Sequence, residues 1–167
     1  MEAIQAIGYS GQEFSLQGEK DRFVLPQPFR KEVALASEGA NVLCLAKHPR
    51  WTCLTGFGTQ RARGFEAELD REDARALQLG QNFDRDVRSG QLWTFSKVLF
   101  DDSGRFQIPE KLVGIANIGD QLYFRGGSPF FTLWNPEQLA KMGEGWESDL
   151  AACVIMQRDA LAKARRK

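Results

Sequence analysis

The chain carries the same short pattern twice, and this repeat limits its possible folds more than any other feature. Residues 22–26 read Arg-Phe-Val-Leu-Pro, and residues 105–109 read Arg-Phe-Gln-Ile-Pro. The two arginines lie 83 residues apart, and so do the two prolines. A unit that recurs along a chain sets its architecture and has to be interpreted before single elements are. We therefore expect two related structural units.

A second pair of matching segments follows the first. Residues 48–54, His-Pro-Arg-Trp-Thr-Cys-Leu, align with residues 128–134, Ser-Pro-Phe-Phe-Thr-Leu-Trp, at an offset of 80. Each unit then has a recognisable pattern over only about 50 residues, a size that buries little apolar surface by itself. We expect the two units to share one interlocked β core.

The second copy of the repeat has the local chemistry of a hairpin. Asp101-Asp102-Ser103-Gly104 is a polar tetrad directly before an alternating apolar run. Aspartate favours the first position of a turn, and glycine favours a position with positive φ. Pro109 cannot continue a strand ladder. The stretch therefore predicts strand, tight turn and strand, with Phe106 and Ile108 on one face.

Two interpretations of this turn remain open on the local sequence. In the first, Asp101 caps its own backbone and pairs with Arg105, and the turn is purely structural. In the second, Asp101 braces Arg105, so that the guanidinium can reach a phosphate or a guanine edge. Lys20 and Arg22 have the corresponding two interpretations in the first copy, where they are either a solvated hairpin end or a contact to a ligand.

An Asp-x-x-Gly-Arg turn followed by apolar-x-apolar-Pro, in a repeat, resembles the MraZ family. These are bacterial transcriptional regulators encoded at the head of the division and cell-wall gene cluster. The resemblance runs from Tyr9 to about Trp146. It implies an α+β, mainly β fold, in which two AbrB-like (SpoVT/AbrB) swapped-hairpin repeats form an interlocked β-barrel core with peripheral helices.

The resemblance also implies a function and a site. The function is that of a sequence-specific DNA-binding repressor that acts, without a cofactor, on the promoter of its own division and cell-wall operon. The partners are short direct repeats in double-stranded DNA and further copies of the chain, in a homo-oligomer or ring. The implied DNA-binding residues are Asp101, Ser103, Gly104 and Arg105 in the second turn, with Lys20 and Arg22 in the first.

The first turn departs from the family pattern. Gly18 stands where the family has Asp, and Asp21 stands where the family has Gly. The formal net charge is also 0, although nucleic-acid-binding domains often carry a basic excess. These features favour an alternative function, that of an MraZ-like oligomeric protein-interaction module that has lost DNA binding.

The repeat divides the chain into four parts. We predict a first AbrB-like repeat over 9–60, a helical connection over 61–91, a second repeat over 92–147, and a C-terminal helix with a basic tail over 148–167. Residues 1–8 are expected to be a loose extension. Each repeat should contain a short helix after its proline, at 28–33 and at 110–116, and then a β-hairpin. The first hairpin is expected to pair 42–45 with 51–54 before a loop over 55–59, and the second to pair 122–125 with 130–134.

Apolar spacing predicts the remaining helices. After a short helix over 65–69, a longer one is expected from Asp70 to about Ser89, with an inner face of Ala76, Leu79, Phe83 and Val87. Asn135 followed by Pro136 predicts a helix start. A last helix from Ser148 should pack through Leu150, Val154 and Leu161 and fray in the basic tail 163–167.

Composition argues against several other classes of protein. Three cysteines and one histidine lack the spacing of a zinc site or a catalytic Cys-His set, so no metal, no cofactor and no enzyme activity are expected. A perturbed thiol pKa would be the simplest indication that the chain is instead a small enzyme. No apolar run approaches the roughly 18 residues of a membrane span, and the N-terminus lacks the basic start of a signal peptide. We expect reduced cysteines and a cytoplasmic, nucleoid-associated protein.

Overall fold

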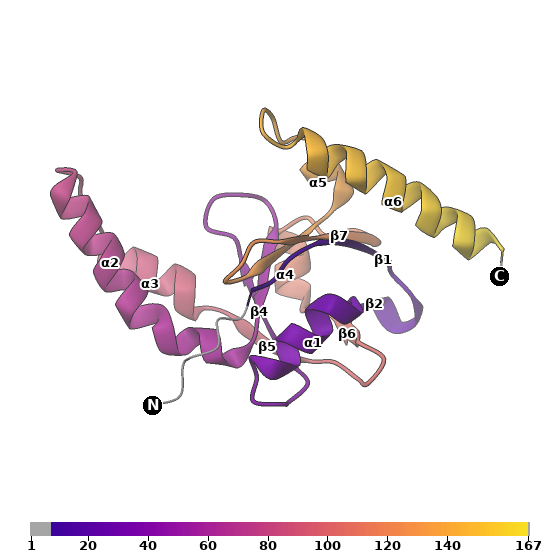
Figure 1. Cartoon of the computed structure of the whole chain (residues 1–167), viewed down its shortest axis with the longest axis horizontal. Helices are drawn as coiled ribbons and strands as arrows, with labels where there is room; N and C mark the ends of the chain where they lie inside the picture. The colour runs from indigo at the N-terminus through magenta and orange to yellow at the C-terminus, as the bar shows by residue number, and fades with distance from the viewer. Residues whose placement is uncertain (1–7, 167) are drawn as a thin grey trace.

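Two antiparallel sheets lie at the centre of the molecule (Figure 1). The computed structural model describes residues 8–166, so all but Gly8 of the predicted 1–8 extension lies outside the described residues. The larger sheet has six strands in the order β1-β7-β8-β4-β3-β5, and the smaller sheet pairs β2 with β6. The strands are β1 (Gln12–Leu16), β2 (Arg22–Val24), β3 (Val42–Lys47), β4 (Leu54–Phe57), β5 (Ser96–Leu99), β6 (Arg105–Gln107), β7 (Gln121–Gly126) and β8 (Phe131–Trp134).

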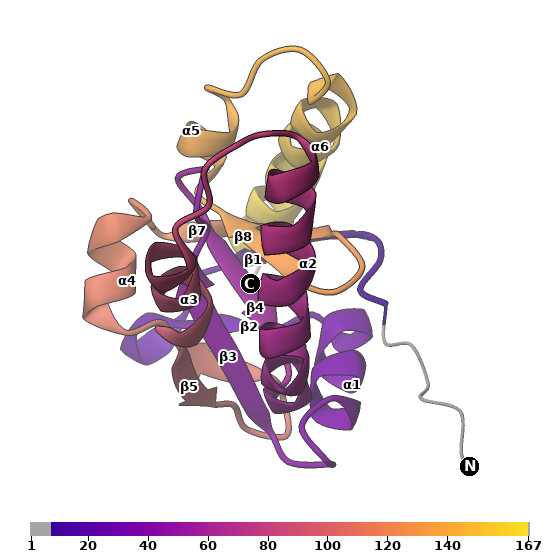
Figure 2. The ribbon, with the colours of Figure 1, turned by 90° about the vertical axis from the view of Figure 1, so that its left-hand side faces the viewer.

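Helices surround these sheets. The short helices α1 and α4 follow the two prolines as predicted, and the arm formed by α2 and α3 projects from one end of the molecule, whereas α6 lies at the other (Figures 1 and 2). The helices are α1 (Gln27–Leu35), α2 (Phe65–Gln78), α3 (Arg85–Trp93), α4 (Glu110–Ile115), α5 (Pro136–Leu139) and α6 (Glu147–Arg165), with 3-10 turns η1 (Glu19–Asp21) and η2 (Thr59–Gly64). None of the described helices is long and apolar enough to cross a membrane.

Strands from the two halves of the chain pair with one another. β1 pairs with β7, β5 pairs with β3, and β2 pairs with β6. Each of these pairs joins a strand from before α2 to a strand from after α3. The two halves therefore share both sheets and one principal core, and the α+β class with its antiparallel sheet is confirmed.

The predicted closed barrel is not found among the described residues. The six-stranded sheet is open, with β1 at one edge and β5 at the other. The strands that could continue across the gap, β2 and β6, instead pair with each other. The step from β1 to β2 is irregular, because the Val24 N–H donates to the Ser15 hydroxyl at 3.0 Å and not to a strand carbonyl.

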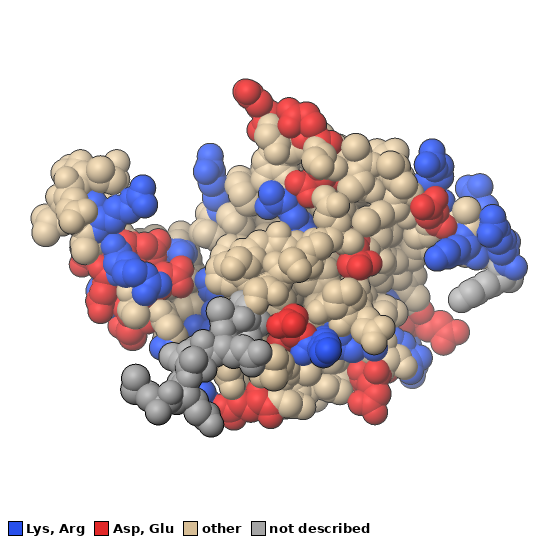
Figure 3. All heavy atoms as spheres, in the orientation of Figure 1, with Lys and Arg blue, Asp and Glu red and all other residues tan. Residues whose placement is uncertain are grey.

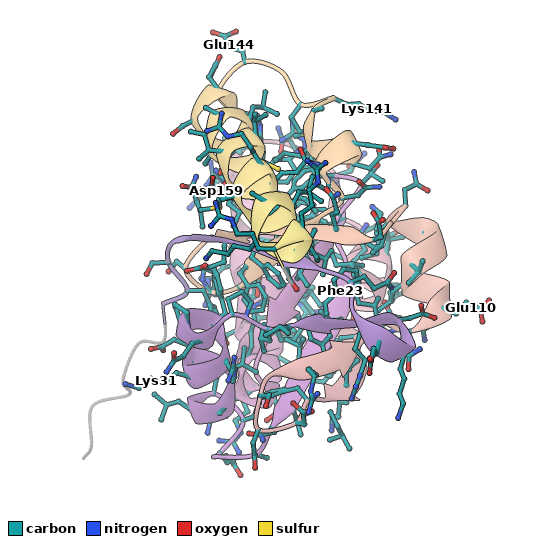
Figure 4. All side chains as sticks on the ribbon, turned by 90° about the vertical axis from the view of Figure 1, so that its right-hand side faces the viewer. Phe23, Lys31, Glu110, Lys141, Glu144 and Asp159 are labelled. Carbon is teal, nitrogen blue, oxygen red and sulfur yellow. The ribbon has the colours of Figure 1, made fainter. Side chains whose placement is uncertain are left out.

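Aromatic side chains fill the space between the small sheet and the large one. Phe23 of β2 lies directly opposite Phe106 of β6, and both are buried. Figure 4 shows Phe23 in the interior, whereas Lys31 and Glu110 point away from the body of the molecule. Buried aromatic rings contribute large apolar areas to a core. The repeated Arg-Phe pattern thus places its phenylalanines where the two halves meet.

The helical connection differs from the prediction. α2 begins at Phe65 and ends at Gln78, and α3 is a separate helix. Gly80 has a left-handed φ of +66°, which ends the first helix. Asp84 then caps α3, since its side chain accepts from the Val87 N–H at 3.1 Å. Leu79 and Val87 are largely exposed, so the predicted single helix and these two inner-face positions are wrong, whereas Phe83 lies between the two helices and packs against the core.

The second strand of the first hairpin begins three residues later than predicted. Residues 51–53 form a bend because Lys47 Nζ donates to the carbonyls of His48 and Trp51, both at 2.7 Å. β4 then covers residues assigned to a loop, including Gly56. A Cβ at Gly56 would lie 2.6 Å from the Phe131 ring. This glycine therefore serves close packing inside a strand and does not mark a turn.

The C-terminal helices confirm one prediction and correct another. Asn135 caps α5 by accepting from the Glu137 N–H at 3.0 Å. α6 extends to Arg165, well into the basic tail, and Lys167 lies outside the described residues. Val154, expected on the inner face, is exposed, and the buried residues of α6 are Asp149 and Cys153.

A buried carboxylate explains how α6 is attached. Asp149 accepts from the Tyr123 hydroxyl at 2.7 Å, from Gln12 Nε2 at 3.1 Å and from Arg125 Nε at 3.0 Å. Buried charge is tolerated when it is paired and hydrogen-bonded in this way. Leu150, which apolar periodicity predicted, also packs against the second core cluster, but periodicity could not reveal the polar contacts of Asp149 to β1 and β7.

Candidate functional site

The ribbon formed by β2 and β6 has one buried and one exposed face. Its register pairs Arg22 with Gln107, Phe23 with Phe106, and Val24 with Arg105. Residues directly opposite in an antiparallel pair project to the same face, and successive residues alternate between faces. Since the two phenylalanines point into the core, the outer face consists of Arg22, Val24, Arg105 and Gln107. The turns that precede β2 and β6 lie at opposite ends of this ribbon.

Asp101 organises the turn before β6. Its Oδ1 accepts from the Ser103 N–H at 3.0 Å and from the Arg105 N–H at 2.9 Å. Its Oδ2 accepts from Arg105 Nε at 2.8 Å. The backbone hydrogen bond from Arg105 is the main cause that lowers the pKa of Asp101. The carboxylate thus fixes an arginine whose side chain remains 49% exposed.

Gly104 is required by the backbone of the same turn. It has a left-handed φ of +86°, which side chains with a Cβ rarely adopt. A Cβ there would lie 2.7 Å from the Leu25 carbonyl oxygen and 2.5 Å from Arg30 Nε. The Leu25 N–H also donates to the Gly104 carbonyl at 2.7 Å. The turn is therefore docked tightly against the first half of the chain.

Two residues that sequence reasoning missed support this turn. Arg30 of α1 donates to the Leu25 carbonyl at 3.1 Å and to the Asp102 carbonyl at 3.3 Å. Asn41 donates to the Asp102 side chain at 3.1 Å. Both lie in the first half of the chain, 72 and 61 residues away from Asp102. No local sequence signal marks them, because the contact exists only after the halves have paired.

The turn before β2 is closed by the same backbone hydrogen bond as the turn before β6, but no carboxylate contacts its arginine. The Gly18 N–H donates to the Arg22 carbonyl at 2.7 Å, as the Asp101 N–H does to the Arg105 carbonyl at 3.1 Å. Arg22 Nε donates only to the Glu19 carbonyl, at 3.3 Å. Lys20 and Asp21 both have a left-handed φ, of 58° and 57°. Arg22 is therefore held by one weak contact to a backbone carbonyl.

The predicted site residues thus fall into two groups. The structure brings Asp101, Ser103, Gly104 and Arg105 together in one turn. Arg22 shares the outer face of the ribbon with Arg105, and Lys20 lies exposed in the other turn. Acidic and basic side chains are interleaved over the face that Figure 3 shows, with no single basic field.

The cysteine side chains are the candidate nucleophiles of the chain. Cys44, Cys53 and Cys153 are free and buried, and burial raises their thiol pKa values to about 11, about 12 and about 11. A nucleophilic cysteine needs a shift in the opposite direction. The part of the chain that the structure describes holds no cluster of three or more His, Cys, Asp or Glu side chains suited to a metal ion.

Fold and site together define a class: a small α+β protein whose halves share antiparallel sheets and display a carboxylate-braced arginine. Three relatives of the chain carry the same name. The chain is 27% identical over 117 residues to Transcriptional regulator MraZ of Parvibaculum lavamentivorans, covering 70% of this chain and 69% of that one. It is 27% identical over 122 residues to the regulator of the same name in Hyphomonas neptunium, covering 72% and 68%.

A third relative extends the match. The chain is 29% identical over 134 residues to Transcriptional regulator MraZ of Roseiflexus castenholzii, covering 80% of each chain. None of the known family models matches the chain. Three relatives of one name thus match most of the chain, and the chain is similar to the MraZ family.

Proposed function

We propose that this protein is a sequence-specific DNA-binding transcriptional regulator, and that it represses the promoter of its own operon. The observation that carries the proposal is Arg105, held by Asp101 on an exposed turn. A fixed guanidinium matches the geometry of a phosphate or of the guanine edge. The name of the three relatives supports the same conclusion.

The geometry of the ribbon suggests how the contact would be made. Asp101 occupies Nε of Arg105, so both terminal nitrogens of that guanidinium remain available to DNA. A two-stranded β-ribbon fits the major groove. Arg105 would contact a base edge or phosphate, whereas Ser103, Gly104, Lys20 and Arg22 would add contacts to the DNA backbone.

Self-association would multiply these contacts. Several copies bound to short direct repeats gain affinity by avidity without any new type of contact. The projecting elements support a homo-oligomer, since Leu77 at the end of α2 is 81% exposed and Val154 on α6 is 61% exposed. These residues lie on elements at opposite ends of the molecule, as a ring of identical copies requires (Figure 1). Occupancy of the promoter by such a ring would hinder transcription sterically.

We also propose that the chain consists of two AbrB-like repeats. The strand exchange between the halves supports two AbrB-like swapped-hairpin repeats over 9–60 and 92–147, joined by 61–91 and followed by 148–167. A repressor of this kind would act in the cytoplasm, on the nucleoid, and would need neither a cofactor nor an enzymatic step.

DNA binding can be tested by fluorescence anisotropy with DNA from upstream of the gene over a salt series. Binding should weaken steeply with salt, because phosphate contacts release counterions. Arg105→Ala should abolish most of the affinity, and Arg71→Ala, which removes an equal charge from the exposed surface of α2, should not. Equal losses in both variants would contradict a specific contact at Arg105.

The second candidate function is an interaction module that has lost DNA binding. It is favoured by the formal net charge of 0 and by the missing carboxylate in the first turn. The same salt series separates the two functions. No binding at low salt by a correctly folded protein would support the interaction module and reject the regulator.

A further inference from the structure

A small cavity lies where the arm joins the sheet. Its volume is about 50 Å³, and it is bounded by the end of β3, by η2, by α3 and by Phe130. It shares no residue with either turn of the ribbon. The polar side chains at the cavity are Lys47, His48, Thr55, Arg61, Arg88 and Gln91. Three of these six, Lys47, Arg61 and Arg88, are positively charged near neutral pH, and none of the six is acidic.

Arg61 is the most unusual of these residues. Its side chain is only 15% exposed, and its guanidinium lies 4.9 to 5.0 Å from the centres of three aromatic rings, those of Phe57, Phe65 and Phe130. Its ion pair with Glu68 is long, at 3.6 Å. Among the described residues, none accepts a hydrogen bond from this guanidinium. Because the described part of the chain has no buried unsatisfied side-chain nitrogen, these donors are open to the cavity or to solvent and can bind an acceptor there.

His48 contributes a second donor. Its Nδ1 accepts from the N–H groups of Arg50 and Trp51, at 3.0 and 3.1 Å. Burial lowers the pKa of His48 to about 4, so the ring is neutral near pH 7. A neutral ring that accepts at Nδ1 carries its proton on Nε2. That Nε2–H has no acceptor among the described residues, and because the described part of the chain has no buried unsatisfied side-chain nitrogen, it is open to the cavity or to solvent.

The nearby carboxylates are already engaged. Glu72 accepts from Arg88 Nε at 3.0 and 3.1 Å, and Glu68 accepts from Arg88 at 3.4 Å. The Gln91 carbonyl also accepts from Arg88, at 3.4 Å, and its amide N–H₂ has no acceptor among the described residues. The cavity wall therefore presents N–H donors and positive charge, and the nearest acceptors are occupied. Such a surface suits an anion with several acceptor oxygens.

We propose that this cavity is a binding site for a small tetrahedral oxyanion of the phosphate type. A space of about 50 Å³ holds about four waters, so a phosphate group fits and a whole nucleotide does not. Arg61 and Arg88 would bind its oxygens, and His48 and Gln91 would donate from the β3 end and from α3. The bound anion would tie α3 and η2 to the sheet. This site is separate from the proposed DNA contacts, and through it the concentration of the anion could influence the regulator.

The one histidine of the chain provides a direct readout. The ring ¹⁵N signals of His48 should shift saturably when inorganic phosphate is added to the full chain, with half-saturation below about 10 mM. Sodium chloride at matched ionic strength should have no such effect. A shift that grows linearly, or that chloride reproduces, would overturn the proposal.

Two variants and one control locate the site. Arg61→Met keeps apolar contact with the three rings and removes every donor, and should weaken phosphate binding about tenfold or more. Gln91→Met changes an exposed residue and should weaken it about threefold, which keeps the test valid if Arg61→Met fails to fold. Arg105→Ala should bind phosphate normally. Unchanged binding in folded Arg61→Met, or in Gln91→Met if that is the only variant that folds, would reject the site.

The source of the phosphate can be distinguished with the same signal. Glycerol phosphate that shifts the His48 signal like inorganic phosphate would indicate a terminal phosphate monoester, whereas inorganic phosphate alone would indicate the free ion. A DNA duplex that saturates the signal would instead make the cavity part of the DNA interface and overturn an independent site. DNA binding by Arg61→Met in phosphate-free buffer should match that of the unaltered chain, so failure of this site leaves the DNA proposal untouched.

Discussion

The two turns of the repeat have the same backbone closure and differ in what holds their arginine. Arg105 is fixed by an aspartate through its side chain and its backbone, whereas Arg22 contacts one carbonyl. The position that Gly104 occupies with a φ of +86° is occupied in the first turn by Asp21, with a φ of 57°. A repeat can therefore keep its closing backbone hydrogen bond although the side chains and some of the φ angles around it differ.

The difference has a cost in each turn. A residue with a Cβ in the left-handed region costs roughly 1 to 2 kcal/mol, and the first turn contains two such residues, Lys20 and Asp21. An arginine that is free to move must also be ordered on binding, which costs about 0.5 to 1.5 kcal/mol. In the second turn, Asp101 already orders Arg105 before DNA binds. We therefore expect the two turns to contribute unequally to stability and to DNA affinity.

The largest effect should come from Gly104→Ala. The new Cβ would meet the Leu25 carbonyl and Arg30 in a left-handed backbone, so we expect a loss of about 2 to 4 kcal/mol in the free energy of unfolding. Chemical denaturation measures this loss. Gly143→Ala is the matched control, since nothing lies within 4 Å of its added Cβ.

Asp21 gives the same experiment an internal comparison. It already has a side chain at the corresponding position, and it is exposed. Asp21→Ala should therefore change the free energy of unfolding by no more than about 1 kcal/mol. A loss equal to that of Gly104→Ala would show that the first turn is docked as tightly as the second.

The next effect concerns DNA affinity. Arg105→Ala should weaken binding by about 1 to 3 kcal/mol, the value of a good bidentate contact. Arg22→Ala should weaken it about threefold, mainly through a smaller salt slope, because a loosely held arginine acts as a general phosphate contact. Anisotropy titrations of both variants on one DNA make the comparison. Equal losses would establish the first turn as a full contact.

Much of this asymmetry could be predicted from the sequence, because it lies in neighbouring residues. The turn, its brace and the inward phenylalanines follow from local chemistry. The support from Arg30 and Asn41 could not be predicted, since both contact the second turn across the shared sheets.

The errors of prediction have similar causes. Apolar spacing continues through Gly80, so periodicity alone joined two helices that the backbone separates. The local sequence predicts a loop at Gly56, although close packing against Phe131 requires a glycine in that strand. Asp149 attaches α6 through polar contacts that hydrophobic patterning does not detect. For Gly56 and Asp149 the deciding partner is distant in sequence, whereas for Gly80 the cause is the local backbone conformation.

A smaller effect is expected when the first turn is given the chemistry of the second. The double variant Gly18→Asp, Asp21→Gly places a carboxylate beside Arg22 and a glycine at the left-handed position. Relief of backbone strain and the greater freedom of glycine in the unfolded chain should nearly cancel in stability. DNA affinity should rise about threefold, as a preorganised arginine needs less ordering. If DNA affinity does not rise in the anisotropy titration, a carboxylate beside the arginine is not the cause of the difference in DNA affinity between the two turns.

The smallest effect is a difference between the arginines in acid. The pKa of Asp101 is lowered in the folded chain, chiefly by the Arg105 N–H, so its carboxylate contributes stability above the usual aspartate pKa of about 3.9 and loses it as pH falls through the lowered value. The brace of Arg22 is a carbonyl, which does not titrate. In ¹⁵N spectra the Arg105 Nε–H signal should therefore move in acid while that of Arg22 stays, and in Asp101→Asn it should be displaced already near neutral pH. Joint movement of both signals, with loss of circular dichroism at the same pH, would show that the whole fold is lost before the brace is.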